Sequence, residues 1–320
     1  MTLHTRLTKR LGIRHPILQA PMGSTAGGAL AAAVSAAGGL GLIGGGGAPA
    51  DWVEQQFVAA GNQRVGCGFI TWRLAEQPSV LDVALRHSPV AIMFSFGDAS
   101  PFIPKVKERG ILVICQVQSL MMARCVIDLG ADIIVAQGAE AGGHGSQRAT
   151  LPLVPAVVDQ VKRSGREVPV VGAGGIADGR GLAAALMLGA DGVLIGTRFH
   201  VSEESLASDA AKARIVSANG DATVRTRVFD IGRGAAWPLE FTGRGLANSF
   251  TDAWHGREAE LWNDTIARAQ YNHAFEASDL DTAVVWAGEG IDLIGKIEPA
   301  GAIVQGIMAG AEAALAQRFN

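Results

Sequence analysis

The sequence predicts an α/β protein, a (β/α)8 TIM barrel with a small, mainly helical C-terminal insertion domain. Short apolar runs rich in β-branched residues alternate with longer helical patterns, which is typical of parallel βαβ units. Eight such units follow one another along the first 200 residues, and glycine-rich loops come after the last two runs. Closure into a barrel of this type requires eight units at such a spacing.

The starts of the eight expected strands lie 23, 25, 25, 21, 21, 36 and 24 residues apart. A doubly wound open sheet shows the same alternation and is the alternative. The count of eight and the glycine loops favour the barrel. The expected strands are residues 17–20, 40–43, 65–70, 90–94, 111–116, 132–137, 168–172 and 192–196.

Helical patterns fill the intervals between these strands. Gly110, Gly130 and Gly189 follow three of them, at positions where a left-handed C-cap is least strained for glycine. The uncharged stretch 27–50 has the length of a membrane span, but its Ala- and Gly-rich composition instead predicts a buried helix followed by a barrel strand. The other expected helices are residues 80–86, 104–109, 120–129, 153–163 and 179–188.

The last third of the chain departs from the alternation. Residues 256–276 have a helical pattern, whereas residues 237–238 and 242–243 indicate irregular chain. We predict a (β/α)8 barrel domain formed by residues 1–200 and 300–320, closed by a helix over 300–319, and a small helical domain, residues 201–299, covering the barrel mouth. The aromatic residues of the small domain either line a pocket or form an apolar core, and the apolar core is the simpler interpretation for most of them. They are Trp237, Phe241, Trp254, Trp262 and Trp286.

Composition argues against several classes of partner. The net charge is -3 and basic residues form no run, so we expect neither nucleic acid nor a membrane surface as partner. No apolar segment of the secretory type follows the charged first ten residues. Cys67, Cys115 and Cys125 form neither a metal-ligand spacing nor an even disulfide set, so we interpret all three as structural. Together these features predict a cytoplasmic protein without a metal site.

The strongest local signal for a ligand is the pair of glycine loops after the last two strands. Gly174 and Gly175 follow the seventh expected strand, and Gly196 and Thr197 lie where the eighth ends and the next loop begins. Backbone amides of such loops, with the start of the following helix, hold a phosphate dianion. One Gly-Gly pair can be a tight turn alone, but two loops after consecutive final strands predict a phosphate site.

An enlarged loop, residues 138–150, follows the sixth expected strand, at the end of a barrel that carries the chemistry. It contains His144, flanked by glycines that leave the imidazole unshielded. Histidine titrates near neutral pH, which suits proton abstraction or hydrogen bonding to an anion. A purely structural hydrogen-bonding role is the alternative. Glu140 either orients this loop or is solvated.

Two other strand ends carry candidate residues. After the first strand, Pro21 fixes a turn, and a backbone amide beyond it can face a flat ring, although a simple strand terminator explains the pattern equally well. If Gln116 points into the barrel mouth, alternation sends Cys115 toward the helices. The sequence has no lysine at a strand end for a Schiff base and no GxSxG or HExxH motif. The glycines of residues 41–47 lack the spacing and the acidic ribose partner of a dinucleotide-binding turn.

Taken together, these motifs resemble the nitronate monooxygenase (2-nitropropane dioxygenase) family. The GGHG motif is fairly specific, whereas AGGIADGRG is shared with other phosphate-binding barrels, including IMP dehydrogenases. The resemblance spans roughly the first 200 residues, with one later piece. The matching segments are HPILQAPM (15–22), AAGGLG (36–41), QGAEAGGHG (137–145), AGGIADGRG (173–181), residues 188–199 and WAGEG (286–290).

The resemblance implies FMN in the barrel mouth and assigns a role to each matching residue. His144 corresponds to the active-site histidine of the family, which hydrogen-bonds the nitro group or acts as a base on a neutral nitroalkane. The implied FMN contacts are Gly174, Gly175, Gly196 and Thr197 at the phosphate, Pro21, Met22 and Gly23 beside the isoalloxazine ring, and Gln137 and Gly142.

Two further positions near the flavin depart from the family pattern. Gly68 stands where many relatives carry a side chain, often asparagine, so a polar contact is missing. Gln116 is neutral where some relatives, including quinone-reducing ones, carry lysine.

The implied reaction is FMN-dependent oxidation of small alkyl nitronates with O2 to a carbonyl compound and nitrite. The superfamily also contains NAD(P)H-dependent quinone reductases and enoyl-acyl-carrier-protein reductases, so a flavin reductase of that kind is the first alternative. A cofactor-free isomerase or lyase acting on a phosphorylated substrate and a flavin-binding protein without turnover are the others. The sequence leaves open whether the chain forms a homo-oligomer.

Overall fold

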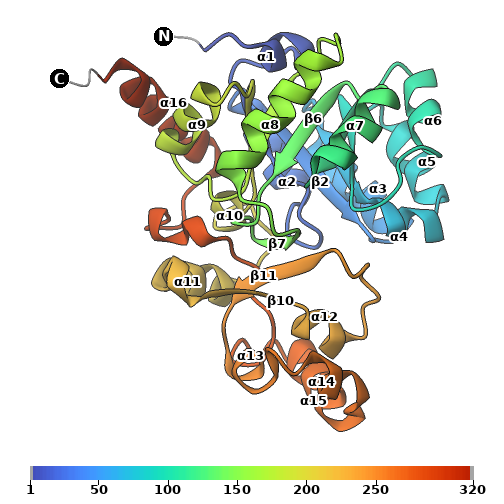
Figure 1. Ribbon diagram of the computed structural model, residues 1–320, viewed down its shortest axis with the longest axis vertical. Helices are drawn as coiled ribbons and strands as arrows, with labels where there is room; N and C mark the ends of the chain where they lie inside the picture. Colours follow the sequence, from blue (N-terminus) through green and yellow to red (C-terminus); the bar gives the residue numbers. More distant parts are fainter. Residues whose placement is uncertain (1–2, 318–320) are drawn as a thin grey trace.

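Eight parallel strands close into a barrel in the computed structural model, which describes residues 3–317 (Figure 1). Closure comes from β1, which pairs with β2 on one side and with β9 on the other. The barrel is therefore confirmed and the open sheet is wrong. In barrel order the strands are β1 (Ile17–Gln19), β2 (Leu40–Gly46), β3 (Gly66–Ile70), β4 (Ala91–Ser95), β5 (Leu112–Val117), β6 (Ile133–Gln137), β8 (Val170–Ala173) and β9 (Gly192–Ile195).

All eight expected strands are present, with ends that differ by up to three residues. The largest difference is in β2, which continues to Gly46, beyond the expected end at residue 43. Glycines have low strand propensity, yet the parallel ladder with β3 uses backbone atoms alone, and it continues with a register shift between Gly44 and Gly46.

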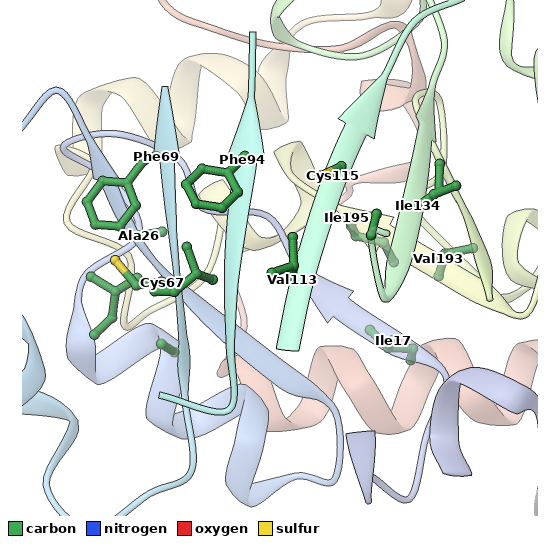
Figure 2. Close-up of a cluster of buried hydrophobic side chains, with 14 of the residues drawn as sticks. Ile17, Ala26, Cys67, Phe69, Phe94, Val113, Cys115, Ile134, Val193 and Ile195 are labelled. Atoms are coloured by element: carbon green, nitrogen blue, oxygen red, sulfur yellow. The ribbon is translucent and has the colours of Figure 1, made fainter. Parts of the chain in front are cut away.

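Alternate side chains of the strands form two apolar layers. One set fills the barrel interior, including Leu18, Met93 and Val135. The other set points outward against the helices, and Figure 2 shows part of this outer layer, with Cys67 and Cys115 among its apolar neighbours. Burial raises the pKa of both thiols to about 12, so their structural role is confirmed. Cys125 is exposed on α7 and belongs to neither layer, which contradicts the prediction for that cysteine.

The five helices expected between residues 80 and 188 are present, with ends that differ by up to three residues, whereas four further helices, at residues 6–11, 50–60, 71–76 and 197–200, were not expected. Gly110, Gly130 and Gly189 have positive φ values of 69°, 78° and 90°, as left-handed helix ends require. The uncharged stretch 27–50 forms α2 and then β2, as predicted. These helices are α1 (Arg6–Leu11), α2 (Gly28–Ala36), α3 (Ala50–Ala60), α4 (Thr71–Glu76), α5 (Ser79–Arg86), α6 (Ile103–Glu108), α7 (Leu120–Asp128), α8 (Thr150–Arg163), α9 (Gly179–Met187) and α10 (Thr197–His200).

None of the helices between residues 3 and 317 combines the length and the apolar composition that crossing a bilayer needs.

Residues 201–299 form a layer of short helices and a small sheet beside the barrel, drawn in yellow to orange in Figure 1. We call this segment the cover. Its elements are α11 (Asp209–Ser217), η1 (Gly220–Ala222), β10 (Thr223–Thr226), α12 (Val228–Arg233), β11 (Thr242–Leu246), α13 (Ser249–Trp254), α14 (Glu258–Asn263), α15 (Thr265–Glu276) and η2 (Glu289–Leu293).

Two expectations for the cover are corrected. The helix expected over residues 256–276 is divided into α14 and α15 at Asp264, whose side chain accepts a hydrogen bond from the Ala267 amide and so caps α15. Residues 242–243, expected to be irregular, begin β11, which pairs with β10 and with β7 (Gly143–Gly145) of the enlarged barrel loop. The division of the chain into two domains at residues 200 and 300 stays a prediction.

The chain returns to the barrel as α16 (Ala300–Ala316), which packs on α9 and α2. Its buried face, which includes Ile303, Val304 and Ile307, joins the outer apolar layer. The predicted end of this helix at residue 319 lies outside the described residues. The contact with α9 is close at Gly179, where an added Cβ would lie 2.2 Å from the Ala311 nitrogen.

We therefore expect Gly179→Ala to destabilise the fold by about 1–3 kcal/mol, because α9 and α16 must separate to admit one methyl group. The matched control is Gly306→Ala on the exposed side of α16, where an added Cβ meets no atom within 4 Å. This change should stabilise the protein by about 0.5–1 kcal/mol, since alanine favours a helix. Urea unfolding measures both, and equal effects in the two variants would contradict the close packing of α9 and α16.

Candidate active site

A cavity of about 620 Å³ opens at the carboxyl ends of the barrel strands, between the barrel and the cover. The structure brings every site residue expected from the sequence to this one cavity. They are Pro21, Met22, Gly23, Gly68, Gln116, Gln137, Gly142, His144, Gly174, Gly175, Gly196 and Thr197. Their shared location is a structural fact, whereas the role of each residue stays a prediction.

Backbone forms one end of the cavity, after β8 and β9. Gly174 and Gly175 have φ values of +106° and +69°, so this turn admits few other residues. An added Cβ at Gly142 would lie 2.6 Å from the Gly288 nitrogen and 2.9 Å from Thr197 Oγ1. The loops after β6 and β9 and the segment at Gly288 therefore meet closely, and the Gly288 amide donates to Thr197 Oγ1 at 3.1 Å.

Gln137, at the end of β6, connects neighbouring strands to the enlarged loop. Its Oε1 accepts hydrogen bonds from Gln116 Nε2 at 3.1 Å and Gln118 Nε2 at 2.9 Å. Its own Nε2 donates to the backbone oxygen of His144 at 3.0 Å. Gln116 thus faces the barrel mouth as predicted, while Cys115 points to the helices.

Two half-buried arginines of the cover contact the same loop. Arg225 on β10 donates to the backbone oxygens of Ala139 and Ala141, at 2.9 and 2.8 Å. Arg244, its partner across the ladder on β11, donates to the Ala139 oxygen at 3.0 Å and forms an ion pair with Glu289 at 2.7 Å. Burial, with the charge of Arg244, lowers the pKa of Arg225 to about 10, so it remains a cation at neutral pH.

Glu140 orients the loop rather than being solvated. Its carboxylate accepts hydrogen bonds from the Thr150 amide at 2.9 Å and from the Thr150 hydroxyl at 2.7 Å. Thr150 is the first residue of α8, so Glu140 supplies the acceptor for a free amide at the start of that helix.

His144 lies in the middle of β7, opposite Gly243 of β11. Its Nε2 lies 2.9 and 3.1 Å from the two carboxylate oxygens of Asp230 on α12, a residue that is 3% exposed. Arg233, one turn further along α12, donates to Asp230 Oδ1 at 2.7 Å. The buried carboxylate of Asp230 therefore contacts both His144 and Arg233.

The environment of His144 favours the neutral imidazole. Burial lowers the pKa of His144 below its ordinary value, and the charges of Arg233 and Arg225 act in the same direction. The hydrogen bond and charge of Asp230 oppose this shift without cancelling it. At neutral pH the ring is therefore uncharged, with one nitrogen protonated and the other free to accept.

Aromatic side chains surround the imidazole. Trp237 stacks on it with ring centroids 3.4 Å apart and planes 7° from parallel. Trp286 lies tilted at 5.1 Å, and Phe96 meets it edge-on at 6.4 Å. Phe96 has a φ of +63°, a strained conformation for a bulky residue that aims its ring into the cavity.

The aromatic residues of the cover were expected either to line a pocket or to form an apolar core, and the structure shows some of each. Trp237 and Trp286 line the cavity. Phe241 is buried against Phe96 behind it, and Trp254 packs on the small core of the cover. Trp262 has 54% of its surface exposed, so it belongs neither to the cavity wall nor to the apolar core.

Sequence reasoning missed the residues that hold His144 and its loop in place: Asp230, Arg233, Arg225, Arg244 and Phe96. Asp230 is 86 residues away from His144 along the chain, and the two meet where β7 pairs with β11. No local motif marks these residues. The one available signal was the presence of several charged residues in the glycine- and aromatic-containing segment 225–244.

Comparisons with known proteins identify the family of the chain. A family model described as nitronate monooxygenase matches residues 4–62 and 70–310. A nitronate monooxygenase of Neurospora crassa is 34% identical, with 90% of this chain and 87% of that protein covered. FabK from Thermotoga maritima is similar in structure, with a TM-score of 0.86, 32% identity and 98% of both chains covered.

A further relative is similar to this chain over only part of its own length. A (3aS,4S,5R,7aS)-5-hydroxy-7a-methyl-1-oxo-octahydro-1H-indene-4-carboxyl-CoA dehydrogenase of Mycobacterium tuberculosis is 38% identical over 72% of this chain. The alignment spans 65% of the length of that dehydrogenase.

The closed eight-stranded barrel, with glycine loops after its last two strands and a half-buried histidine at its mouth, places the protein in the class of (β/α)8 barrels with a ligand-sized cavity at the carboxyl ends of the strands. Because the family model matches nearly the whole chain, the protein belongs to the nitronate monooxygenase family.

The arginine contacts on the loop of His144 lead to a test. Arg225→Met keeps the apolar stem but removes the side-chain donor of the Ala141 oxygen and leaves Arg244 as the side-chain donor to the Ala139 oxygen. We expect a loss of about 2–4 kcal/mol in unfolding free energy. Amide hydrogen exchange of residues 138–145 should accelerate in the same variant.

The matched control is Arg214→Met, which removes an ion pair with Asp281 whose side chains are 38% and 79% exposed. That change should cost about 0–1 kcal/mol. Unchanged exchange in the loop of Arg225→Met would show that Arg225 does not hold it.

Proposed function

We propose that this protein binds one FMN non-covalently and oxidises small alkyl nitronates with O2 to a carbonyl compound and nitrite. One observation carries the proposal: the glycine loops after β8 and β9 and His144 line the same cavity of a chain that belongs to the nitronate monooxygenase family. The glycine loops would then hold the FMN phosphate, and His144 would contact the substrate, within the same cavity.

The residues at the phosphate end fit an anion. Gly174, Gly175 and Gly196 place backbone without side chains at the cavity wall, so amides can approach phosphate oxygens. Thr197 adds a hydroxyl, and the carboxylate of Glu140 is engaged by Thr150. The fit supports FMN rather than a larger nucleotide, because the sequence shows no second nucleotide motif.

The residues near the barrel axis fit a flat ring. An added Cβ at Gly23 meets no atom within 4 Å, so the backbone after β1 is open to the cavity. An added Cβ at Gly68 would lie 2.3 Å from Pro21 Cγ, so glycine at this position lets Pro21 lie directly on β3. The departure from the family pattern at residue 68 therefore has a steric reason in this chain.

Bound FMN would supply a two-electron acceptor that O2 can reoxidise. The chain itself binds and orients the substrate and restricts water. His144 offers a hydrogen bond or a proton acceptor at the substrate. Trp237, Trp286 and Phe96 form apolar walls around it, which strengthens electrostatic interactions at the nitro group.

An NAD(P)H-dependent flavin reductase is the second candidate, favoured by the structural similarity to FabK over 98% of the chain. The two candidates differ in the electron donor. Membership of the nitronate monooxygenase family gives no support to the third alternative, a cofactor-free isomerase or lyase.

Anaerobic mixing of the purified holoprotein tests the proposal. We expect released cofactor with the mass of FMN, and bleaching of the flavin by a preformed alkyl nitronate without any nicotinamide. Bleaching by NADH or NADPH but not by a nitronate would favour the reductase instead. Release of FAD, or no flavin binding on reconstitution, would remove the cofactor assignment.

His144→Ala should reduce the oxidation of a neutral nitroalkane by about 10²–10⁴-fold, the usual effect of losing a general base. Oxidation of the preformed nitronate should fall less, because the loss is a hydrogen bond worth about 1–3 kcal/mol. FMN content should be retained, since the glycine loops lie on other strands. His273→Ala, an exposed position on α15, is the control and should change neither rate. Full activity of His144→Ala on both substrates would exclude a role in the reaction.

A further inference from the structure

We propose that Asp230 is a positioning residue that sets the tautomer of His144, so that Nδ1 is left as the proton acceptor facing the substrate. The inference rests on the proposed function in one respect, namely that His144 acts on a molecule bound in the cavity. Its structural part, the tautomer, can be tested without any substrate.

The contacts of the imidazole determine which nitrogen carries the proton. Both oxygens of Asp230 lie within hydrogen-bond distance of His144 Nε2, at 2.9 and 3.1 Å. An ionised carboxylate only accepts hydrogen bonds, so Nε2 must carry the hydrogen. A neutral imidazole has a single N–H, and its other nitrogen, Nδ1, therefore keeps its lone pair.

Nδ1 is the ring nitrogen available to a ligand. It makes no hydrogen bond to any residue between 3 and 317, and His144 lines the cavity. The stacked Trp237 covers one face of the ring and the strand pairing of β7 fixes the backbone, so the imidazole cannot turn freely. The orientation of Nδ1 thus follows from three independent contacts: the carboxylate, the indole and the strand.

Arg233 forms an ion pair with Asp230. Its guanidinium donates to Asp230 Oδ1 at 2.7 Å and also lies over the ring of Trp286, at 5.5 Å from the centroid. The charged groups that face His144 are Asp230 and Arg233 from α12 and Arg225 from β10. The two arginines lower the pKa of His144 and Asp230 raises it, so the pair Asp230–Arg233 leaves a neutral base with a defined tautomer.

This arrangement matches a substrate that enters as a neutral carbon acid. The bond between the α-carbon and its hydrogen breaks, the proton goes to Nδ1, and the electron pair moves into the nitro group to give the nitronate within the site. The imidazolium that forms is then stabilised by Asp230 behind Nε2. A nitronate added from solution needs no such step, so the two substrates separate the role of Asp230 from binding.

Asp230→Asn is the main variant. The cation of Arg233 holds the amide oxygen, which turns the amide NH2 toward His144 Nε2. Nε2 must then accept, the proton moves to Nδ1, and the ring can no longer take a proton from the substrate. We expect anaerobic flavin reduction by a neutral nitroalkane to fall about 10²–10⁴-fold, while reduction by the preformed nitronate changes by less than about tenfold.

Arg233→Gln is the matched control, because it removes the neighbouring charge and keeps the carboxylate. The tautomer should be unchanged. Loss of a cation raises the pKa of His144, and the base is active only when neutral, so the acid limb of kcat/KM for the nitroalkane should move to higher pH. In Asp230→Asn the group that raised this pKa is gone, so any residual activity should have its acid limb at lower pH. Shifts in the same direction in both variants would overturn the proposal.

Nitrogen NMR of protein labelled with [15N]histidine tests the tautomer directly, with the His144 resonances identified by their absence in His144→Gln. We expect a pyridine-type Nδ1 and a pyrrole-type Nε2 in the wild-type protein, and the reverse in Asp230→Asn. A protonated Nδ1 in the neutral wild-type ring would overturn the proposal whatever the variants do. The expected tautomer without flavin reduction by either nitro substrate would instead refute the proposed function and leave the role of Asp230 standing.

Discussion

The antiparallel pairing of β7 with β11 is the contact on which the site depends. Three residues of the enlarged barrel loop pair with three of the cover: Gly143 with Arg244, His144 with Gly243, and Gly145 with Thr242. Glycine at 243 is required here, because an added Cβ would lie 2.4 Å from the ring of Trp286. The cover therefore approaches the loop closely enough for a histidine from the barrel to meet a carboxylate from α12.

Two parts of the chain contribute different properties to the cavity. The barrel supplies backbone, in the glycine loops after β8 and β9, and the amide contacts of Gln137. The cover supplies charge and aromatic surface: Arg225 on the loop carbonyls, Asp230 behind the imidazole and Trp237 on its face. The chemistry of His144 is consequently set by residues that lie outside the barrel, although the histidine itself follows a barrel strand.

The sequence predicted the barrel well because its strands are buried on both faces and therefore appear as continuous apolar runs. The glycine loops and His144 could be found for a related reason, since their position after a strand places them at the barrel mouth. The strands of the cover could not be found in this way. β11 reads Thr-Gly-Arg-Gly-Leu and has no apolar alternation, and its pairing partner β7 is only three residues long. Asp230 was missed because its partner lies in a distant segment, and the break at Asp264 was missed because a single capping side chain decides it.

A crystal structure of the protein with FMN and a bound nitroalkane tests the central claim, that the cover turns a histidine of the barrel loop toward a flavin held by the glycine loops. The account predicts phosphate density at Gly174, Gly175, Gly196 and Thr197, and the nitroalkane between the isoalloxazine ring and His144 Nδ1, with Asp230 on Nε2. A phosphate bound elsewhere in the cavity, or His144 turned away from the flavin with its contact to Asp230 broken, would contradict it.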